Sequence, residues 1–199
     1  MAGMQPTTAG TYRVLDSTRS PDELLLLDIE SQDPTYVTTT GYEDDLADRV
    51  AEVAAGNRID ATLSWDDDAP RFAELSIDTR TTIEFVDGAT DLFEVARETW
   101  NEARREGEAM NSRVTQDTDG ETNGVVYTFA EQAGQRDLYG EFRDGVTPLE
   151  PLIDRLGEGS ESPYAVFVIR PAEHPFVLVA LALDRDGLFA GTIRDTYFA

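Results

Sequence analysis

The sequence contains no cysteine, and His174 is its one histidine. Without cysteine the chain forms no disulfide, supplies no thiolate for catalysis and holds no iron–sulfur cluster or Cys-type zinc ion. A single histidine also excludes most histidine-rich metal sites. We therefore expect no cofactor.

Lysine is absent too, since all 16 basic residues are arginine. A chain without lysine has neither a P-loop nucleotide site nor a Schiff-base enzyme's nucleophile. It also contains no G-x-G-x-x-G and no G-x-S-x-G motif, which argues against a dinucleotide site and a serine-hydrolase elbow. These absences favour a non-catalytic binding or accessory module over an enzyme.

Long apolar runs are missing. The longest uncharged apolar run, Pro175–Leu183, has the length of a buried strand rather than a membrane span. The first residues, MAGMQPTTAG, have neither the basic region nor the apolar region of a signal peptide. We expect a soluble cytoplasmic protein that does not associate with membranes.

Acidic residues are abundant. Aspartate and glutamate number 40, which gives a net charge of −24 and a pI near 4.1, and 40% of the residues are hydrophobic, enough to build a core. At molar salt the Debye length falls to about 3 Å, so the self-repulsion of such a chain is screened. The composition predicts a halophile's cytosolic protein, and the alternative is an acidic protein that binds basic partners.

The N-terminal part has the element order of an OB-like barrel. Turn residues and short apolar stretches predict three strands, then a helix within Gly41–Ala55 that stops at Gly56. The residues Ile59, Ala61 and Leu63 alternate with polar ones, and the acidic turn Asp66–Asp68 leads into a further strand. Strand, strand, strand, helix, strand, strand is the OB order, which other small α+β folds share. The three first strands are predicted at Tyr12–Leu15, Glu23–Ile29 and Thr35–Thr39.

The C-terminal part reads as a long helix followed by a strand-rich block. An apolar face at helical spacing predicts a helix over Thr90–Met110, and a shorter helix follows Thr147-Pro148. The stretches YAVFVIR, PFVLVALAL and GLFAGTI read as strands, the last two joined by a hairpin turn at Asp184–Gly187. The fold class is therefore α+β, with an OB-like lobe over residues 10–88 and an α+β lobe over residues 89–199. We expect the lobes to form one compact unit.

Arginines beside aromatic residues raise the possibility of nucleic-acid binding. Barrels read single strands by stacking bases on exposed aromatics within a positive groove. Arg58, Arg71 and Phe72 lie on or beside the two predicted strands around the acidic turn and are the candidate contacts, whereas Trp65 is expected in the core. The candidate partners are single-stranded nucleic acid or a protein.

A metal-dependent phosphodiesterase or nuclease is the alternative. Asp28 and Glu30 stand two apart at a predicted strand, so both carboxylates would face one side and hold a divalent ion. Such a site needs further carboxylates from other segments, and a solvated strand end is the simpler interpretation. The loop Asp117–Glu121 has a calcium-loop character but fails the EF-hand pattern, and His174 is expected in a turn.

Several segments resemble an uncharacterised family of haloarchaeal proteins of about this length. They are DELLLLDIES, DATLSWDDDAPRFAELSID, GEAMNSRVTQDTDGETNGVVYTFAEQ, EFRDGVTPLEPLIDR and RPAEHPFVLVALALD, and the likeness extends from Tyr12 to Tyr197. The resemblance implies source, compartment and size. It carries no activity and no site residue.

The charge count generates the first prediction. Circular dichroism in a salt series should show a folded signal and a high melting temperature only near molar salt, because screening then removes the repulsion among carboxylates. An unchanged melting temperature at low millimolar salt would contradict it.

Overall fold

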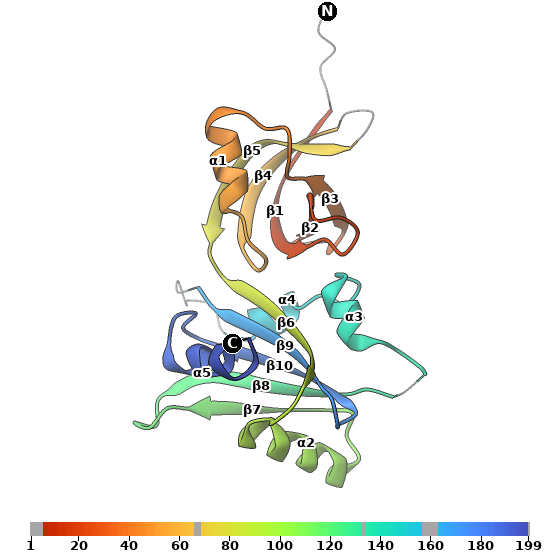
Figure 1. Ribbon diagram of the computed structural model, residues 1–199, viewed down its shortest axis with the longest axis vertical. Coiled ribbons are helices and arrows are strands. Elements are labelled where there is room, and N and C mark those ends of the chain that lie inside the picture. Colours follow the sequence, from red (N-terminus) through yellow and green to blue (C-terminus); the bar gives the residue numbers. More distant parts are fainter. Residues whose placement is uncertain (1–5, 66–68, 133, 157–162, 199) are drawn as a thin grey trace, which may run out of the picture.

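The described part of the chain, residues 6–65, 69–132, 134–156 and 163–198 of a computed structural model, contains ten strands and five helices. The strands form two five-stranded sheets, one in each half of the sequence. Figure 1 shows the two sheets along the long axis, with α3 and α4 between them. The predicted α+β class is confirmed, while the turn Asp66–Asp68 lies outside the described residues.

The first sheet is a small barrel. Its neighbour order is β3-β2-β1-β4-β5, each pair is antiparallel, and β3 approaches β5. This order, with α1 inserted between β3 and β4, matches a five-stranded OB-type barrel. The elements are β1 (Thr7–Asp16), β2 (Glu23–Asp28), β3 (Pro34–Thr38), α1 (Asp44–Glu52), β4 (Arg58–Trp65) and β5 (Pro70–Thr79).

Strand β2 is buried on both faces. Leu24 and Leu26 belong to the barrel core, whereas Leu25 and Leu27 belong to the core of the C-terminal half. Because successive side chains of a strand point to opposite faces, the strand needs apolar residues at consecutive positions. The uninterrupted run Leu24–Leu27, predicted as a buried strand, is the result.

The second sheet contains the remaining strands, in the order β6-β9-β10-β8-β7. Strand β6 pairs in parallel with β9, and the other pairs are antiparallel. The change of sheet therefore falls between Thr79 and Thr82, earlier than the predicted split near Gly88. The strands are β6 (Thr82–Ala89), β7 (Met110–Gln116), β8 (Thr122–Ala130), β9 (Ala165–Pro171) and β10 (Phe176–Ala182).

Helices cover both faces of the second sheet. On one face lie α2 (Glu94–Glu106) and α5 (Leu188–Tyr197), and on the other lie α3 (Leu138–Arg143) and α4 (Glu150–Asp154) (Figure 1). Among the described residues, no helix combines the length and the apolar character needed to cross a membrane.

In the C-terminal half the predicted long helix is confirmed as α2 but its bounds are wrong, and the predicted strand GLFAGTI is wrong. The long helix begins later than Thr90 and ends at Gly107, whose φ of 71° is the left-handed C-cap conformation, so Met110 opens a strand instead. The stretch GLFAGTI is the start of α5 rather than a strand. Its residues Ala190 and Ile193, three apart, are the buried positions, which is a helical spacing.

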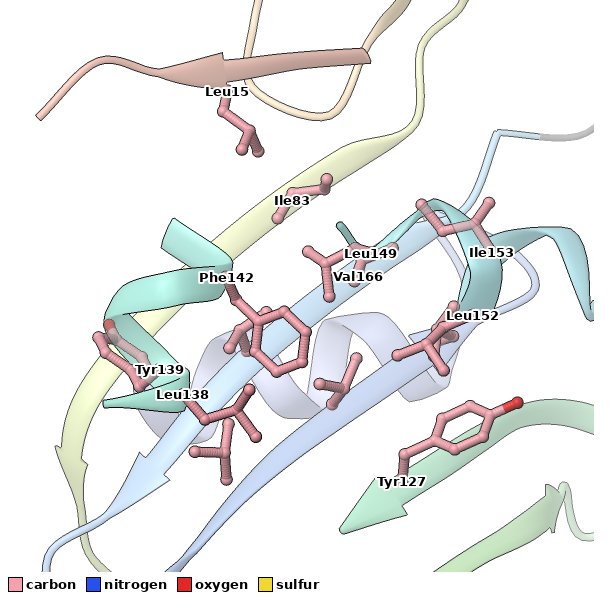
Figure 2. Close-up of a cluster of buried hydrophobic side chains, with 14 of the residues drawn as sticks. Leu15, Ile83, Tyr127, Leu138, Tyr139, Phe142, Leu149, Leu152, Ile153 and Val166 are labelled. Carbon is pink, nitrogen blue, oxygen red and sulfur yellow. The ribbon is translucent and has the colours of Figure 1, made fainter. Parts of the chain in front are cut away.

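The C-terminal half packs against the outside of the barrel. Leu15 of β1 faces a cluster that includes Ile83 of β6, Phe142 of α3 and Leu149 beside α4 (Figure 2). Gly56 lies in the α1–β4 loop with φ +97°, and a Cβ there would come within 2.4 Å of the Ile83 backbone nitrogen. Only glycine allows this approach of the loop to β6.

A buried ion pair crosses the same interface. Arg13 of β1 donates to Glu150 of α4 through Nε (2.8 Å) and Nη2 (2.7 Å), and its Nη1 donates to the Gly56 carbonyl (2.8 Å). The two side chains are only 7% and 5% exposed. Nearby, the buried Asn57 side chain donates to the Thr81 carbonyl at 3.1 Å. The barrel and the C-terminal half are thus joined by apolar packing and by polar groups that satisfy one another.

Helix α3 is held to the sheet by Arg170. The guanidinium donates to Asp87 (Nε to Oδ1, 2.7 Å) and to Asp137 (Nη1 to Oδ1, 3.0 Å), and it lies 4.7 Å from the centre of the Tyr139 ring. The hydrogen bond from Arg170 lowers the pKa of the Asp87 carboxyl. This ion pair therefore stabilises the fold above the ordinary pKa of aspartate, and its contribution disappears as acid protonates Asp87.

Replacing Glu150 with alanine should destabilise the protein by about 3–5 kcal/mol, because it leaves Arg13 buried without a counter-charge. Denaturant unfolding at high salt measures the loss. The control is Glu52→Ala, which breaks the exposed pair with Arg80 and should cost less than about 1 kcal/mol. Equal small losses for both variants would contradict the role assigned to the buried pair.

The same interface supports our proposal that the two halves form one unit. Trp65 lies on the barrel and Trp100 in the C-terminal core. The variant Trp100→Phe therefore reports the unfolding of the barrel, and Trp65→Phe reports the unfolding of the C-terminal half. Coincident fluorescence transitions are expected for a single cooperative unit. Two separated transitions would instead define two domains.

Candidate functional site

The structure does not bring the predicted nucleic-acid residues together. Arg58 is at the start of β4, and Arg71 pairs with Ser64, six positions along that strand, which is about 20 Å at the rise of a β-strand. The Arg58 Nε lies 3.3 Å from the Asp78 carboxylate. Arg71 donates to the Gly41 carbonyl at 2.7 Å. Arg58 thus has an ion-pair partner, without a hydrogen bond at Nε, and Arg71 has a hydrogen-bond partner within the protein.

Phe72 is wrong as a stacking residue, because it is 3% exposed and belongs to the barrel core. Trp65, expected in the core, is instead 39% exposed and donates from Nε1 to the Thr8 hydroxyl at 3.1 Å. The two aromatics therefore exchange the positions that the sequence predicted. Trp65 is the last residue of β4, so the alternation that buries Ile59, Ala61 and Leu63 does not extend to it.

Part of the barrel face that OB modules commonly use is covered. In these folds strands 2 and 3 and their loops contact the ligand. Here the outward residues Leu15, Leu25 and Leu27 of β1 and β2 are buried in the core of the C-terminal half. These residues form part of the interface with the C-terminal half instead.

The predicted metal pair does not form a site. Strand β2 ends at Asp28, and Glu30 lies in the following turn, so the same-face argument for residues two apart does not apply. Asp28 Oδ1 accepts from the backbone N–H groups of Glu30 and Ser31, each at 2.9 Å. Within the described ranges, no group of three or more acidic or histidine side chains is placed to hold a metal ion.

His174 lies in an exposed turn between β9 and β10, as predicted. With Asp91, Arg97 and Glu173 it lines a small hollow of about 160 Å³. The ring is 6.0 Å from the Phe176 ring. The residues that line this hollow include one hydroxyl side chain, Thr90, and no hydrogen bond joins it to His174 in the described structure. The turn therefore lacks the nucleophile and base pair of a covalent catalyst.

The most promising pocket lies at the other end of the sheet, between the β7–β8 hairpin and the start of α5. Its volume is about 590 Å³. In Figure 1 this hairpin end and the β10–α5 connection lie at the same side of the C-terminal half. The lining includes Asp117, Asp184, Leu183, Leu188, Phe189 and Thr192.

Two short loops of the same pattern form the rim of this pocket. They are the D-x-D-G segments Asp117–Gly120 and Asp184–Gly187. In each loop the first aspartate accepts through Oδ1 from the N–H two residues later, at 2.9 Å for Asp119 and 3.0 Å for Asp186. This Asx turn fixes the two first aspartates, Asp117 and Asp184, at the pocket.

The pocket is negative. None of the described residues that line it is basic. Arg185, within the second loop, instead donates to the Arg80 carbonyl at 2.9 Å and to Asp186 at 2.9 Å. The hydrogen bond from Arg185 to Asp186 lowers the pKa of the Asp186 carboxyl. The start of α5 contributes a partial charge of about +0.5, which is smaller than the two carboxylate charges.

The apolar wall depends on Phe189. Its ring lies so close to β8 that a Cβ at Gly124 would approach the ring within 2.7 Å and the Leu181 carbonyl oxygen within 2.4 Å. Beside it, Leu188 is 84% exposed, the most exposed large apolar side chain in the described residues. The pocket therefore combines an apolar wall with two fixed carboxylates.

Sequence reasoning missed this pocket. The signal in the sequence is the repeated D-x-D-G pattern. Taken separately, one copy resembles an incomplete calcium loop and the other a hairpin turn, and neither indicates a shared pocket. Their proximity follows from the pairing of β8 with β10, which spacing along the chain does not reveal.

Comparison with known proteins finds one match. A family of unknown function, DUF6663, matches residues 4–199. The chain belongs to the DUF6663 family. No curated protein and no solved structure is similar to it. The predicted resemblance to an uncharacterised family is confirmed, and the haloarchaeal source stays a prediction.

Gly124→Ala in this DUF6663 chain should destabilise the protein by about 1–3 kcal/mol, because the added methyl group overpacks the contact with Phe189 and Leu181. The matched control is Gly191→Ala in α5, where a Cβ meets nothing within 4 Å. That change should stabilise the protein by about 0.5–1 kcal/mol, since alanine favours helix. Denaturant unfolding of both variants checks the opposite signs, and a neutral Gly124→Ala would contradict the packing described.

Proposed function

We propose that this protein is a non-catalytic binding module that holds a small ligand in the pocket between the β7–β8 hairpin and α5. The observation that carries the proposal is the lining: an apolar wall from Leu183, Leu188 and Phe189 with a few fixed polar groups. A volume of about 590 Å³ lies within the range of small-molecule sites, which have this mixed composition.

A binding role is favoured over catalysis by the chemistry of the pocket. The hydroxyl of Thr192 donates to the Leu188 carbonyl at 2.9 Å, so it is engaged by the backbone. The lining residues supply no histidine, lysine or tyrosine. In the described structure no hydrogen bond joins the other two threonines of the lining, Thr118 and Thr122, to Asp117 or Asp184. A hydroxyl activated by a base, the arrangement that covalent catalysis uses, is therefore not seen in this set.

A second hollow of similar volume, about 600 Å³, lies on the barrel over β1, β4 and β5. Four of its polar side chains already pair with one another, because Thr11 donates to Asp60 at 2.6 Å and Thr62 donates to Glu74 at 3.1 Å. A ligand there would compete with these bonds. We therefore place the ligand in the C-terminal pocket.

Single-stranded nucleic acid remains a weaker proposal for the barrel. Arg58 and Arg71 would have to bind without Phe72, and both have internal partners. Fluorescence anisotropy with an oligonucleotide, comparing the wild type with Arg58→Gln/Arg71→Gln, tests this surface separately from the pocket.

The pocket is tested by methyl-group NMR of the protein titrated with three probes of one shape: phenethylammonium, phenethyl alcohol and hydrocinnamate. At least one probe should give saturable shifts of the Leu183, Leu188 and Thr192 methyl groups. Leu188→Gln should weaken that binding at least several-fold with little change in stability, because the side chain is exposed.

The matched control is Val146→Gln, which changes another exposed apolar side chain, 71% exposed, outside the pocket. It should bind the probe like the wild type. Absence of saturable shifts with all three probes, or equal effects of both variants, would overturn the proposed function.

A further inference from the structure

We infer that the ligand of this pocket is an organic cation: a compound with an ammonium or guanidinium group and an apolar body. The inference rests on the proposed function and specifies the chemical class of its ligand. The apolar body would cover Leu188 and Phe189, and the positive group would meet Asp117 and Asp184.

Charge complementarity is the first step of the argument. Ten of the 16 arginines form ion pairs with carboxylates in the described structure. At the pocket no such pairing occurs among the described residues, and Arg185 of the second loop donates to the Arg80 carbonyl and to Asp186 instead. The two pocket carboxylates thus keep their charge available to a ligand.

The bonding capacity of these carboxylates is the second step. Each carboxylate has two oxygens with about four acceptor positions. In both Asp117 and Asp184, Oδ1 accepts the backbone N–H of its turn. Within the described part of the chain, no hydrogen bond to Oδ2 of either residue is present. Each side chain is therefore held in place by one oxygen while the other can accept from a cation.

The apolar wall is the third step, because it separates an organic cation from a simple ion. A hydrated metal ion gains nothing from contact with Leu188, which is 84% exposed, and the described residues contain no group of three or more acidic or histidine side chains placed to hold a metal. Burying apolar ligand surface against this wall is favourable by roughly 25 cal/mol per Å². Ligands with both a charge and an apolar body therefore fit the pocket best.

The three probes named above test the class, since they share their phenyl and ethyl groups and differ in charge. At constant salt, phenethylammonium should bind about tenfold or more tightly than phenethyl alcohol, because a charged hydrogen bond adds that much to affinity. Hydrocinnamate should bind most weakly. Dissociation constants from the NMR titrations supply the comparison.

Asp117→Asn and Asp184→Asn remove the charge and keep the Oδ1 acceptor that closes each turn. Each should weaken phenethylammonium binding several-fold and leave phenethyl alcohol unchanged. Asp119→Asn is the matched control, since it makes the same change in the same loop at a residue that does not line the pocket; it should bind both probes like the wild type.

The outcomes separate the two proposals. The cation inference would be overturned if phenethylammonium bound no more tightly than phenethyl alcohol, or if hydrocinnamate bound more tightly than phenethylammonium. The proposed pocket would stand in either case. An equal loss of affinity in Asp119→Asn and Asp184→Asn would also overturn it, because the effect would then reflect net charge alone. No binding of any probe would remove the proposed function and the inference together.

Discussion

The ion pair between Arg13 and Glu150 is the constraint on which the arrangement of the molecule depends. A guanidinium on the outward face of a barrel strand is costly to bury unless a carboxylate meets it with good geometry. Glu150 supplies two bonds, and the Gly56 carbonyl accepts a third. Any shift of α4 along β1 would leave a buried charge without its partner. The pair therefore fixes where the C-terminal half sits, whatever its net contribution to stability.

This placement decides which surfaces remain for function. The outward leucines of β1 and β2 belong to the cluster that includes Phe142 and Leu149, and Figure 2 shows Leu15 facing it. Part of the barrel's usual ligand face is therefore an internal interface. The end of the second sheet where the β7–β8 hairpin meets α5 is left open, since no described barrel residue is among those that line the pocket. Two observations therefore support the binding site we propose: part of the barrel face is covered, and the pocket has a lining suited to a ligand.

Local patterns predicted the elements whose burial is simple. The alternation of Ile59, Ala61 and Leu63 gave β4, and the leucine run of β2 indicated a strand buried on both faces. The start of α5 was misassigned because Leu188-Phe189-Ala190 has strand-like composition after a turn-like tetrapeptide. Its helical state depends on tertiary contacts: Phe189 lies against Gly124, and Ile193 reaches the core of the second sheet. The pocket depends on the same contacts, so it was missed for the same reason.

The net charge of −24 does not by itself give the protein a preference among ligands. If the protein works at molar salt, the Debye length is about 3 Å, and charges farther away are screened. Discrimination by charge is then confined to groups in direct contact with the ligand. A pocket whose lining carries Asp117 and Asp184 and no arginine is such a place, because apolar walls and close contact reduce screening there. The placement of the arginines, rather than the excess of carboxylates, therefore determines where this acidic surface can be selective.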